Sequence, residues 1–283
     1  MAKINDTNYI VVHDIKAHRN GHRLSVIETT SEANLEIFPV TVSDWKHADG
    51  RASDLESICR IPGKNNEFLA AESGHWDGKF GRLFHIRLEG LAPPYSASII
   101  KAYDLPEFDA KGPDDPFGDE FEGMECVMDG ENQLLVFLAE RGGSPAYPAG
   151  LVRWFNVNTA NQTITWTSDG ERGVPVDPPG IMDSALTHRD ISAMYLDGNN
   201  QLWGVSAEDA GDSGPFNSYL YQIGSIEPGS NPPFQPIRSP VAHSIMSGLK
   251  TEALAGPSAE VPASRFSIST EDECLGGVWR SLK

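Results

Sequence analysis

Carboxylates recur at two fixed places when the chain is aligned with itself, and clustered carboxylate oxygens are the ligands that hard cations such as Ca²⁺ and Mg²⁺ prefer. The first column of acids consists of Asp14, Glu56, Glu122, Asp190 and Glu252. The second column consists of Glu28, Glu72, Glu140, Glu208 and Glu271. The spacing indicates one acid of each kind per repeat, so we expect the acids of the first column to converge.

Each copy of the repeat has a first apolar segment, a turn and a second apolar segment. The clearest copies begin at Asp54, Phe121 and Arg189, and weaker copies begin at His13 and Thr251. The dipeptides Asp129-Gly and Asp197-Gly are typical of hairpin turns, so both segments are expected to be antiparallel strands. A third and a fourth strand follow in the better copies.

This pattern predicts an all-β fold, a single β-propeller of about five four-stranded antiparallel blades around a central channel, with six as the alternative count. A β-sandwich is the competing architecture, but it would not require an acid at the same place in every repeat. The expected single domain covers 1–283, with approximate blades at 8–48, 54–106, 120–168, 188–240 and 250–283. The last blade lacks sequence for a fourth strand, and we expect residues 8–12 to supply it and close the ring.

Acids in apolar surroundings need compensation, because burying an unpaired charge costs several kcal/mol. Two kinds of compensation remain open: structural hydrogen bonds and nearby bases, or a bound hard cation. Bases adjoin the acids in the sequence: Lys16, Arg141, His188, Arg189 and Lys250. These bases either pair with the acids or hold an anionic substrate group such as phosphate beside a cation.

Composition narrows the classes of partner. A formal charge of −18 argues against binding nucleic acid through its phosphates.

The start of the chain shows neither a signal peptide nor a membrane anchor, so a cytoplasmic protein is expected if Met1 is native. A trimmed export signal would leave a similar start. The cysteines Cys59, Cys126 and Cys274 lack metal or redox spacing and are interpreted as structural thiols. The acidic run 104–122 is interpreted as a solvated connection and not as an EF-hand loop.

The segments Asp54-Leu-Glu-Ser-Ile and Phe121-Glu-Gly-Met-Glu resemble the D-x-E-G-I type signature of phytase-like and esterase-like β-propellers, including the group labelled SdiA-regulated. The segments 68–74 and 82–86 are also similar to that family. The resemblance implies a calcium-associated propeller with phosphoesterase activity. It implies the metal ligands Glu56, Glu72, Glu122, Glu140, Asp190 and Glu208.

Three functions remain open from the sequence. The first is a hydrolase of phosphate esters or similar anionic esters that depends on Ca²⁺ or Mg²⁺, with His188, Arg189 and Arg141 neutralising the charge that develops in the reaction. The second is a non-catalytic binding scaffold with a structural cation, because one fold can serve many functions. The third is sugar or lactone chemistry by paired carboxylates. The expected partner is a small anionic molecule, with no role for nucleic acid or membrane.

Overall fold

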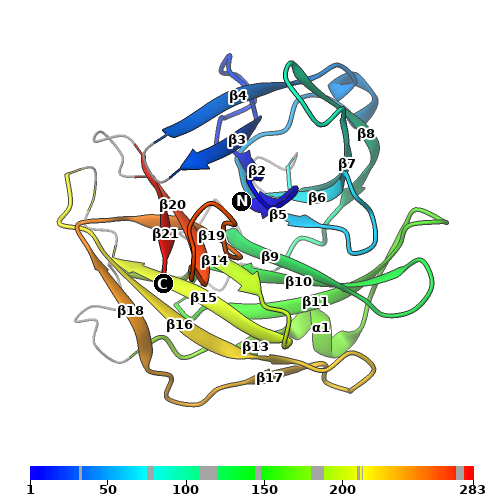
Figure 1. Ribbon diagram of the computed structural model, residues 1–283. Coiled ribbons are helices and arrows are strands. Elements are labelled where there is room, and N and C mark those ends of the chain that lie inside the picture. Colours follow the sequence, from blue (N-terminus) through cyan, green and yellow to red (C-terminus); the bar gives the residue numbers. More distant parts are fainter. Residues whose placement is uncertain are drawn as a thin grey trace.

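The computed structural model describes residues 1–31, 34–74, 80–108, 120–143, 148–179, 188–208, 211, 213–271 and 277–283. Strands dominate this part of the chain, as the sequence predicts, and they form several sheets (Figure 1). The α-helix α1 (Ser168–Arg172) and a 3₁₀ turn (Trp45–Ala48) are the helical elements among the described residues. No helix in the described ranges has both the length and the apolar character needed to cross a membrane.

The N-terminal sheet has eight strands in the order β1-β2-β3-β4-β8-β7-β6-β5. Their bounds are Ala2–Lys3 (β1), Asn8–Val12 (β2), Leu24–Ser31 (β3), Asn34–Val42 (β4), Leu55–Arg60 (β5), Glu67–Glu72 (β6), Arg82–Glu89 (β7) and Tyr95–Asp104 (β8). All neighbouring strands are antiparallel except β4 and β8, which pair in parallel. This pairing joins two of the expected strand groups into one sheet, and contacts between β2 and β5 bring its two sides together.

Two further sheets follow, and both are built on the predicted hairpins. The second sheet contains Phe121–Met128 (β9), Gln133–Glu140 (β10), Leu151–Asn158 (β11), Thr163–Trp166 (β12) and Val174–Pro175 (β13). The third contains His188–Leu196 (β14), Gln201–Glu208 (β15), Asn217–Ile226 (β16), Phe234–Pro236 (β17) and Ala242–Ser247 (β18). The hairpin predictions at Asp129-Gly and Asp197-Gly are confirmed by the antiparallel pairs β9–β10 and β14–β15.

The last sheet has three strands: Thr251–Ala255 (β19), Phe266–Thr270 (β20) and Trp279–Leu282 (β21). The expected closure by residues 8–12 is wrong at the level of hydrogen bonds, because β2 pairs with β1 and β3. Among the described strands, β21 pairs with β20 alone. The first and last sheets contact each other through side chains instead, and the ring centroids of Tyr9 and Trp279 lie 6.1 Å apart.

Five apolar clusters separate the successive strand groups. One cluster lies between β1–β4 and β5–β8, and the next three lie between each later group and the one before it. A fifth joins β2 and β3 to the last sheet. Strand β10 illustrates the pattern: Leu134 and Val136 face one cluster, whereas Leu135 and Phe137 face the next. This alternation explains why the second strands read as apolar runs, since both of their faces are buried.

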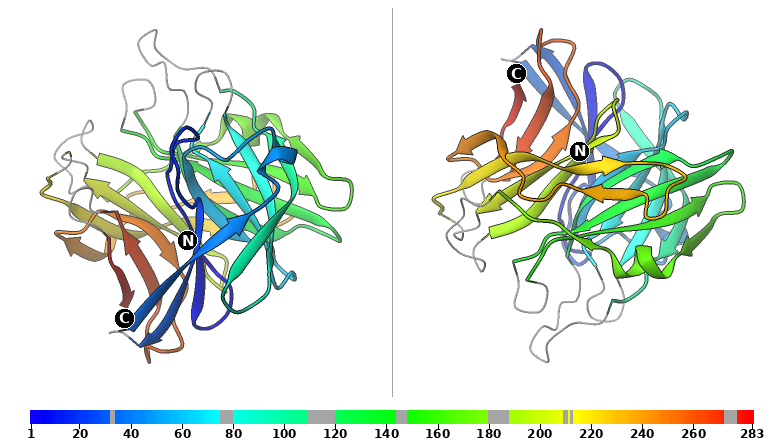
Figure 2. Two further views of the ribbon diagram at one scale, coloured as in Figure 1. Left: turned by 90° about the horizontal axis from the view of Figure 1, so that it is seen from above. Right: turned by 90° about the horizontal axis from the view of Figure 1, so that it is seen from below.

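The first strands of the groups lie innermost and contact one another in sequence. Strand β5 contacts β9, β9 contacts β14, and β14 contacts β19. Strand β1 contacts both β5 and β19, and the N-terminus lies near the centre of the view in Figure 1. Seen from above and from below, the N-terminus again lies among the strands (Figure 2). Side chains that leave the innermost strands are therefore brought together.

Candidate functional site

Three glutamates of the first column occupy equivalent irregularities on the innermost strands. On β5, Leu55 pairs with Glu72 and Ser57 with Ala71, which leaves Glu56 as an extra residue. The same register shift leaves Glu122 extra on β9 and Glu252 extra on β19. A β-bulge bends its strand and redirects the extra side chain. The bulges thus provide a local reason why these carboxylates depart from the apolar packing of their strands.

A polar cavity of about 210 Å³ lies where these strands meet. The acids that line it are Asp14, Asp54, Glu56, Glu120, Glu122, Glu252 and Glu271. The bases that line it are Lys16, Arg141, Arg189 and Lys250, and Ser73 completes the lining. Carboxylates therefore outnumber bases around this cavity. Four of its acids belong to the first column and one to the second, so the self-alignment located most of this cluster.

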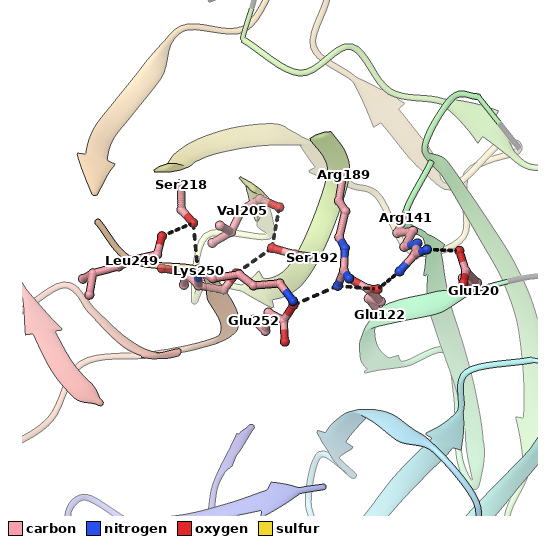
Figure 3. Close-up of polar contacts among 11 residues, drawn as sticks. Glu120, Glu122, Arg141, Arg189, Ser192, Val205, Ser218, Leu249, Lys250 and Glu252 are labelled. Atoms are coloured by element: carbon pink, nitrogen blue, oxygen red, sulfur yellow. Dashed lines mark hydrogen bonds and ion pairs between the residues drawn. The ribbon is translucent and has the colours of Figure 1, made fainter. Parts of the chain in front are cut away.

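One half of the cavity is a chain of alternating charges, drawn in Figure 3. Arg189 Nη1 lies 2.9 Å from Glu122 Oε1 and 2.8 Å from Glu252 Oε1. Lys250 Nζ lies 3.1 Å from the same Glu252 oxygen. Arg141 pairs with Glu122, at 3.1 Å, and with Glu120. This network of ion pairs links β19, β14 and β9, and it contains three of the bases that the sequence places beside the acids: Arg141, Arg189 and Lys250.

The other half of the cavity carries an excess of acid. Ligand oxygens of Asp14, Asp54 and Glu56 all lie within 4.8 Å of one another. Lys16 pairs with Asp54, but Glu56 makes no ion pair with any described residue. Burial raises the pKa of Glu56 well above its usual value, and the nearby charges of Glu122, Asp54, Glu252 and Asp14 raise it further. Ionised Glu56 is therefore costly unless a cation joins this cluster.

Two further groups add acceptor oxygens to the cluster. Glu122 is 7% exposed, and its Oε2 has no hydrogen-bond partner among the described residues, although its Oε1 accepts from two arginines. Burial raises the pKa of Glu252 to about 7, helped by a hydrogen bond with Glu271 and opposed by Arg189 and Lys250. Together with Glu56, these groups give the cavity a surplus of acceptor oxygens.

The second column serves a different purpose in two copies. Glu72 is fully buried and accepts hydrogen bonds from Ser53 N at 2.8 Å and from Arg82 Nη2 at 2.7 Å on one oxygen. Its other oxygen accepts from Arg82 N and Nε at 2.9 and 3.0 Å. Glu140 is likewise fully buried, with Arg153 Nη2 3.2 Å from its Oε2. Each arginine comes from the third strand of the same repeat, Arg82 from β7 and Arg153 from β11, so these acids connect strands within one sheet and do not line the cavity.

The remaining predicted residues lie apart from the cavity. Asp190 accepts a hydrogen bond from Gly150 N at 2.6 Å. The bulge on β14 is longer than those on the other inner strands, and Arg189, not Asp190, lines the cavity. Glu208 accepts from Asn217 Nδ2 at 2.6 Å, and Glu28 accepts from Tyr95. His188 begins β14, but its side chain lies outside the described residues, as do Cys274 and residues 109–119 of the acidic run.

The cavity contains residues that the sequence interpretation did not select, chiefly Asp54 and Glu120. Asp54 adopts a left-handed backbone conformation with φ of 61° just before β5. Its main chain is held there by hydrogen bonds from Asp54 N to Ile15 O and from Ser73 N to Asp54 O, of 3.3 and 2.9 Å. The spacing Asp-x-Glu over 54–56 was the available signal, and Glu120-x-Glu122 repeats it.

An apolar groove of about 390 Å³ opens beside the acidic cavity. Its walls include Val12, Ile27, Leu35, Ile37, Val278 and Trp279, from the first and last sheets. Its lining also includes Asp14, Glu56, Glu252 and Glu271, which line the cavity as well. The two spaces therefore share a carboxylate wall.

No protein-family model matches this chain, and no curated protein sequence matches it.

Proposed function

We propose that the chain is a five-bladed β-propeller whose acidic channel mouth binds a divalent cation, and that it hydrolyses phosphate esters or similar anionic esters there. Support for the architecture comes from five strand groups, the successive contacts of their first strands and five apolar clusters that alternate with the groups around the ring. The parallel pairing of β4 with β8 is then a link between the outer strands of the first two blades.

The observation that carries the cation proposal is the close approach of Asp14, Asp54 and Glu56, together with a Glu56 pKa that burial and the neighbouring carboxylates raise. Every donor in this set is a carboxylate oxygen, which suits Ca²⁺ or Mg²⁺ better than softer metals. The unpartnered Oε2 of buried Glu122 also fits an arrangement in which a cation neutralises the cavity. Calcium is the first choice because Ca²⁺ accepts several carboxylates in flexible geometry.

The bound cation would polarise the substrate and lower the pKa of an attacking water. The chain's own groups have separate tasks. Asp14, Asp54 and Glu56 hold the cation, and Lys16 limits repulsion by pairing with Asp54. Arg141 and Arg189 line the same cavity and supply guanidinium donors suited to phosphate oxygens. Glu252, whose pKa lies near 7, can exchange a proton near neutral pH and is the acid–base candidate.

A turnover assay tests this proposal. Chelator-treated protein is supplied with Ca²⁺, Mg²⁺ or Mn²⁺ and a panel of phosphate monoesters and diesters, and release of phosphate or alcohol is followed. We expect turnover that requires the added cation, is abolished in Glu56→Gln and is retained in the control Glu208→Gln, whose carboxylate lies outside the cavity. Absence of turnover with every cation and ester would refute the hydrolase proposal.

A non-catalytic scaffold is the second candidate, and one observation favours it. Both guanidiniums that would receive an anionic group are already paired, Arg141 with Glu120 and Glu122, and Arg189 with Glu122 and Glu252. Under this alternative the cation and the ion pairs hold adjacent inner strands together. It predicts that the cation raises thermal stability while no ester is hydrolysed.

A further inference from the structure

The groove beside the acidic cavity has chemistry that limits the substrate. Leu35 and Ile37 on its wall are 39% and 59% exposed, whereas most large apolar side chains of the described chain are buried. Exposed apolar side chains that gather around a cavity commonly mark a binding site. The bases of the polar cavity, Lys16, Arg141, Arg189 and Lys250, are absent from the described lining of the groove. The apolar part of these walls would desolvate hydroxyls that lie against it without replacing their hydrogen bonds, whereas His13, Ser269, Thr270 and the shared acids form the polar part.

We propose, building on the proposed cation site, that the substrate is amphiphilic: a phosphate ester, or a similar anionic ester, of an apolar alcohol. The anionic head lies at the carboxylate wall that the two spaces share, where a bound cation and the guanidiniums receive it. The apolar alcohol extends between β3, β4 and β21 and contacts Ile27, Ile37 and Trp279. A groove of about 390 Å³ accommodates a chain or ring of drug-like size. Sugar and polyol phosphates are disfavoured.

Binding of ethyl phosphate and octyl phosphate tests this assignment without relying on turnover. Calorimetric titration is performed with saturating Ca²⁺ and with octyl phosphate below its micelle concentration. Removing one methylene from water tightens binding by up to about fourfold. We therefore expect octyl phosphate to bind at least tenfold more tightly than ethyl phosphate. The variant Ile37→Ser should lose a large part of that preference. Ile245→Ser is the matched control, because Ile245 is 60% exposed but does not line the groove.

The outcomes separate this inference from the proposed function. A chain-length preference that depends on Ile37, found in a protein without turnover, supports the groove and contradicts the hydrolase. Equal affinity for the two alkyl phosphates, or a preference that Ile37→Ser leaves unchanged, overturns the groove assignment even if esters are hydrolysed. Failure of both compounds to bind also overturns it.

Two cysteines on adjacent inner strands form an independent second feature. Cys59 on β5 and Cys126 on β9 are both buried, and their Sγ atoms lie 2.8 Å apart. Cys126 Sγ also donates to Arg60 O at 3.1 Å, which fixes its direction. The sulfurs need to approach by less than about 1 Å to reach the length of a disulfide bond. Neither thiol belongs to the acidic cavity.

We infer that Cys59 and Cys126 are a disulfide site that joins strands β5 and β9 under oxidising conditions. With hydrogen peroxide as oxidant, one thiolate attacks an oxygen and forms a sulfenic acid, and the second thiol then displaces water. The two thiols lose two protons and two electrons, the sulfur–sulfur bond forms, the O–O bond breaks and two waters leave. Burial, together with Cys126, raises the pKa of the Cys59 thiol, so oxidation is slow at neutral pH.

Mass spectrometry tests the site. The reduced protein is treated with excess peroxide at about pH 8.5 to raise the thiolate fraction, then denatured, alkylated and digested. We expect a disulfide-linked peptide pair containing Cys59 and Cys126, absent from Cys126→Ser and present in the control Cys274→Ser. The bond closes a loop of 67 residues, so oxidation should raise the Tm by roughly 5–10 °C. Recovery of both cysteines as alkylated or over-oxidised side chains would overturn the assignment.

Discussion

Arg189 on β14 lies 2.9 Å from Glu122 on β9, and this ion pair ties one inner strand to the next. The same Nη1 atom also reaches Glu252 on β19 at 2.8 Å. One guanidinium thus connects three innermost strands at the edge of the acidic cavity. Because the participating side chains are largely buried, the pairing matters for stability as well as for the charge of the site.

Replacing Arg189 by Met should destabilise the fold by about 1.5–3 kcal/mol, because Glu122 and Glu252 lose their shared cation but keep Arg141 and Lys250 beside them. Urea unfolding measures this change. The control is Arg172→Met, whose exposed side chain pairs only with Asp169 three residues away and should contribute less than about 1 kcal/mol. The double variant Arg189→Met/Glu122→Gln should lose less stability than the sum of its single changes. Additive losses would show that the pair is not coupled.

Replacing Glu56 by Gln should raise the Tm of the chelator-treated protein, because this side chain lies among other carboxylates and has no described cation partner. The substitution keeps the shape of the side chain and removes the free energy needed to protonate Glu56, or to hold its charge beside other carboxylates, on folding. Differential scanning calorimetry measures the effect. A lower Tm for the variant would mean that ionised Glu56 is stabilised by its surroundings.

Replacing Glu72 by Gln should have the opposite effect. Its two oxygens accept four hydrogen bonds, three of them from Arg82, and the substitution leaves a buried guanidinium without its counter-charge. We expect a loss of about 3–5 kcal/mol in urea unfolding while the response to Ca²⁺ is kept. Loss of the Ca²⁺ response in a folded Glu72→Gln protein would indicate that the second column belongs to the cation site.

The contribution of Glu252 to the stability of the metal-free protein should fall as the pH rises from about 4.5 to about 7. The pKa of Glu252 lies near 7 in the folded protein and has an ordinary value of 4.5, so the folded state binds more protons between these limits. The free energy of unfolding therefore decreases with rising pH across that window, and the stabilisation is complete only below its lower limit. Urea unfolding across this range should show a smaller decline in Glu252→Gln. An identical slope in both proteins would contradict the raised pKa.

The sequence predicted the all-β class, the hairpins and much of the acidic cluster, since repeats preserve position along a strand. It grouped Asp190 with the other first-column acids, whereas Arg189 lines the cavity at this strand, because the bulge on β14 is longer than the bulges on β5, β9 and β19. The role of Glu72 depends on Arg82 in the third strand. Arg153 holds the corresponding place beside Glu140, so a comparison of third strands could have revealed both pairs.

The sequence pattern could not predict which strand residues 8–12 pair with, for a different reason. Residues 8–12 have the apolar content of a buried strand, but their hydrogen-bond partner is set by the neighbouring β3 and not by the distant β21. Contact between Tyr9 and Trp279 closes the junction through side chains. Sequence periodicity specifies that a strand is buried, but it does not specify which edge it pairs with.

Calorimetric titration of chelator-treated protein with Ca²⁺ tests the central claim most directly. We predict saturable binding that releases protons, because Glu56 must ionise to become a ligand, and that disappears in Glu56→Gln while Glu208→Gln retains it. Absence of binding to the wild-type protein, or equal binding to the folded Glu56→Gln variant, would contradict a cation site at Asp14, Asp54 and Glu56.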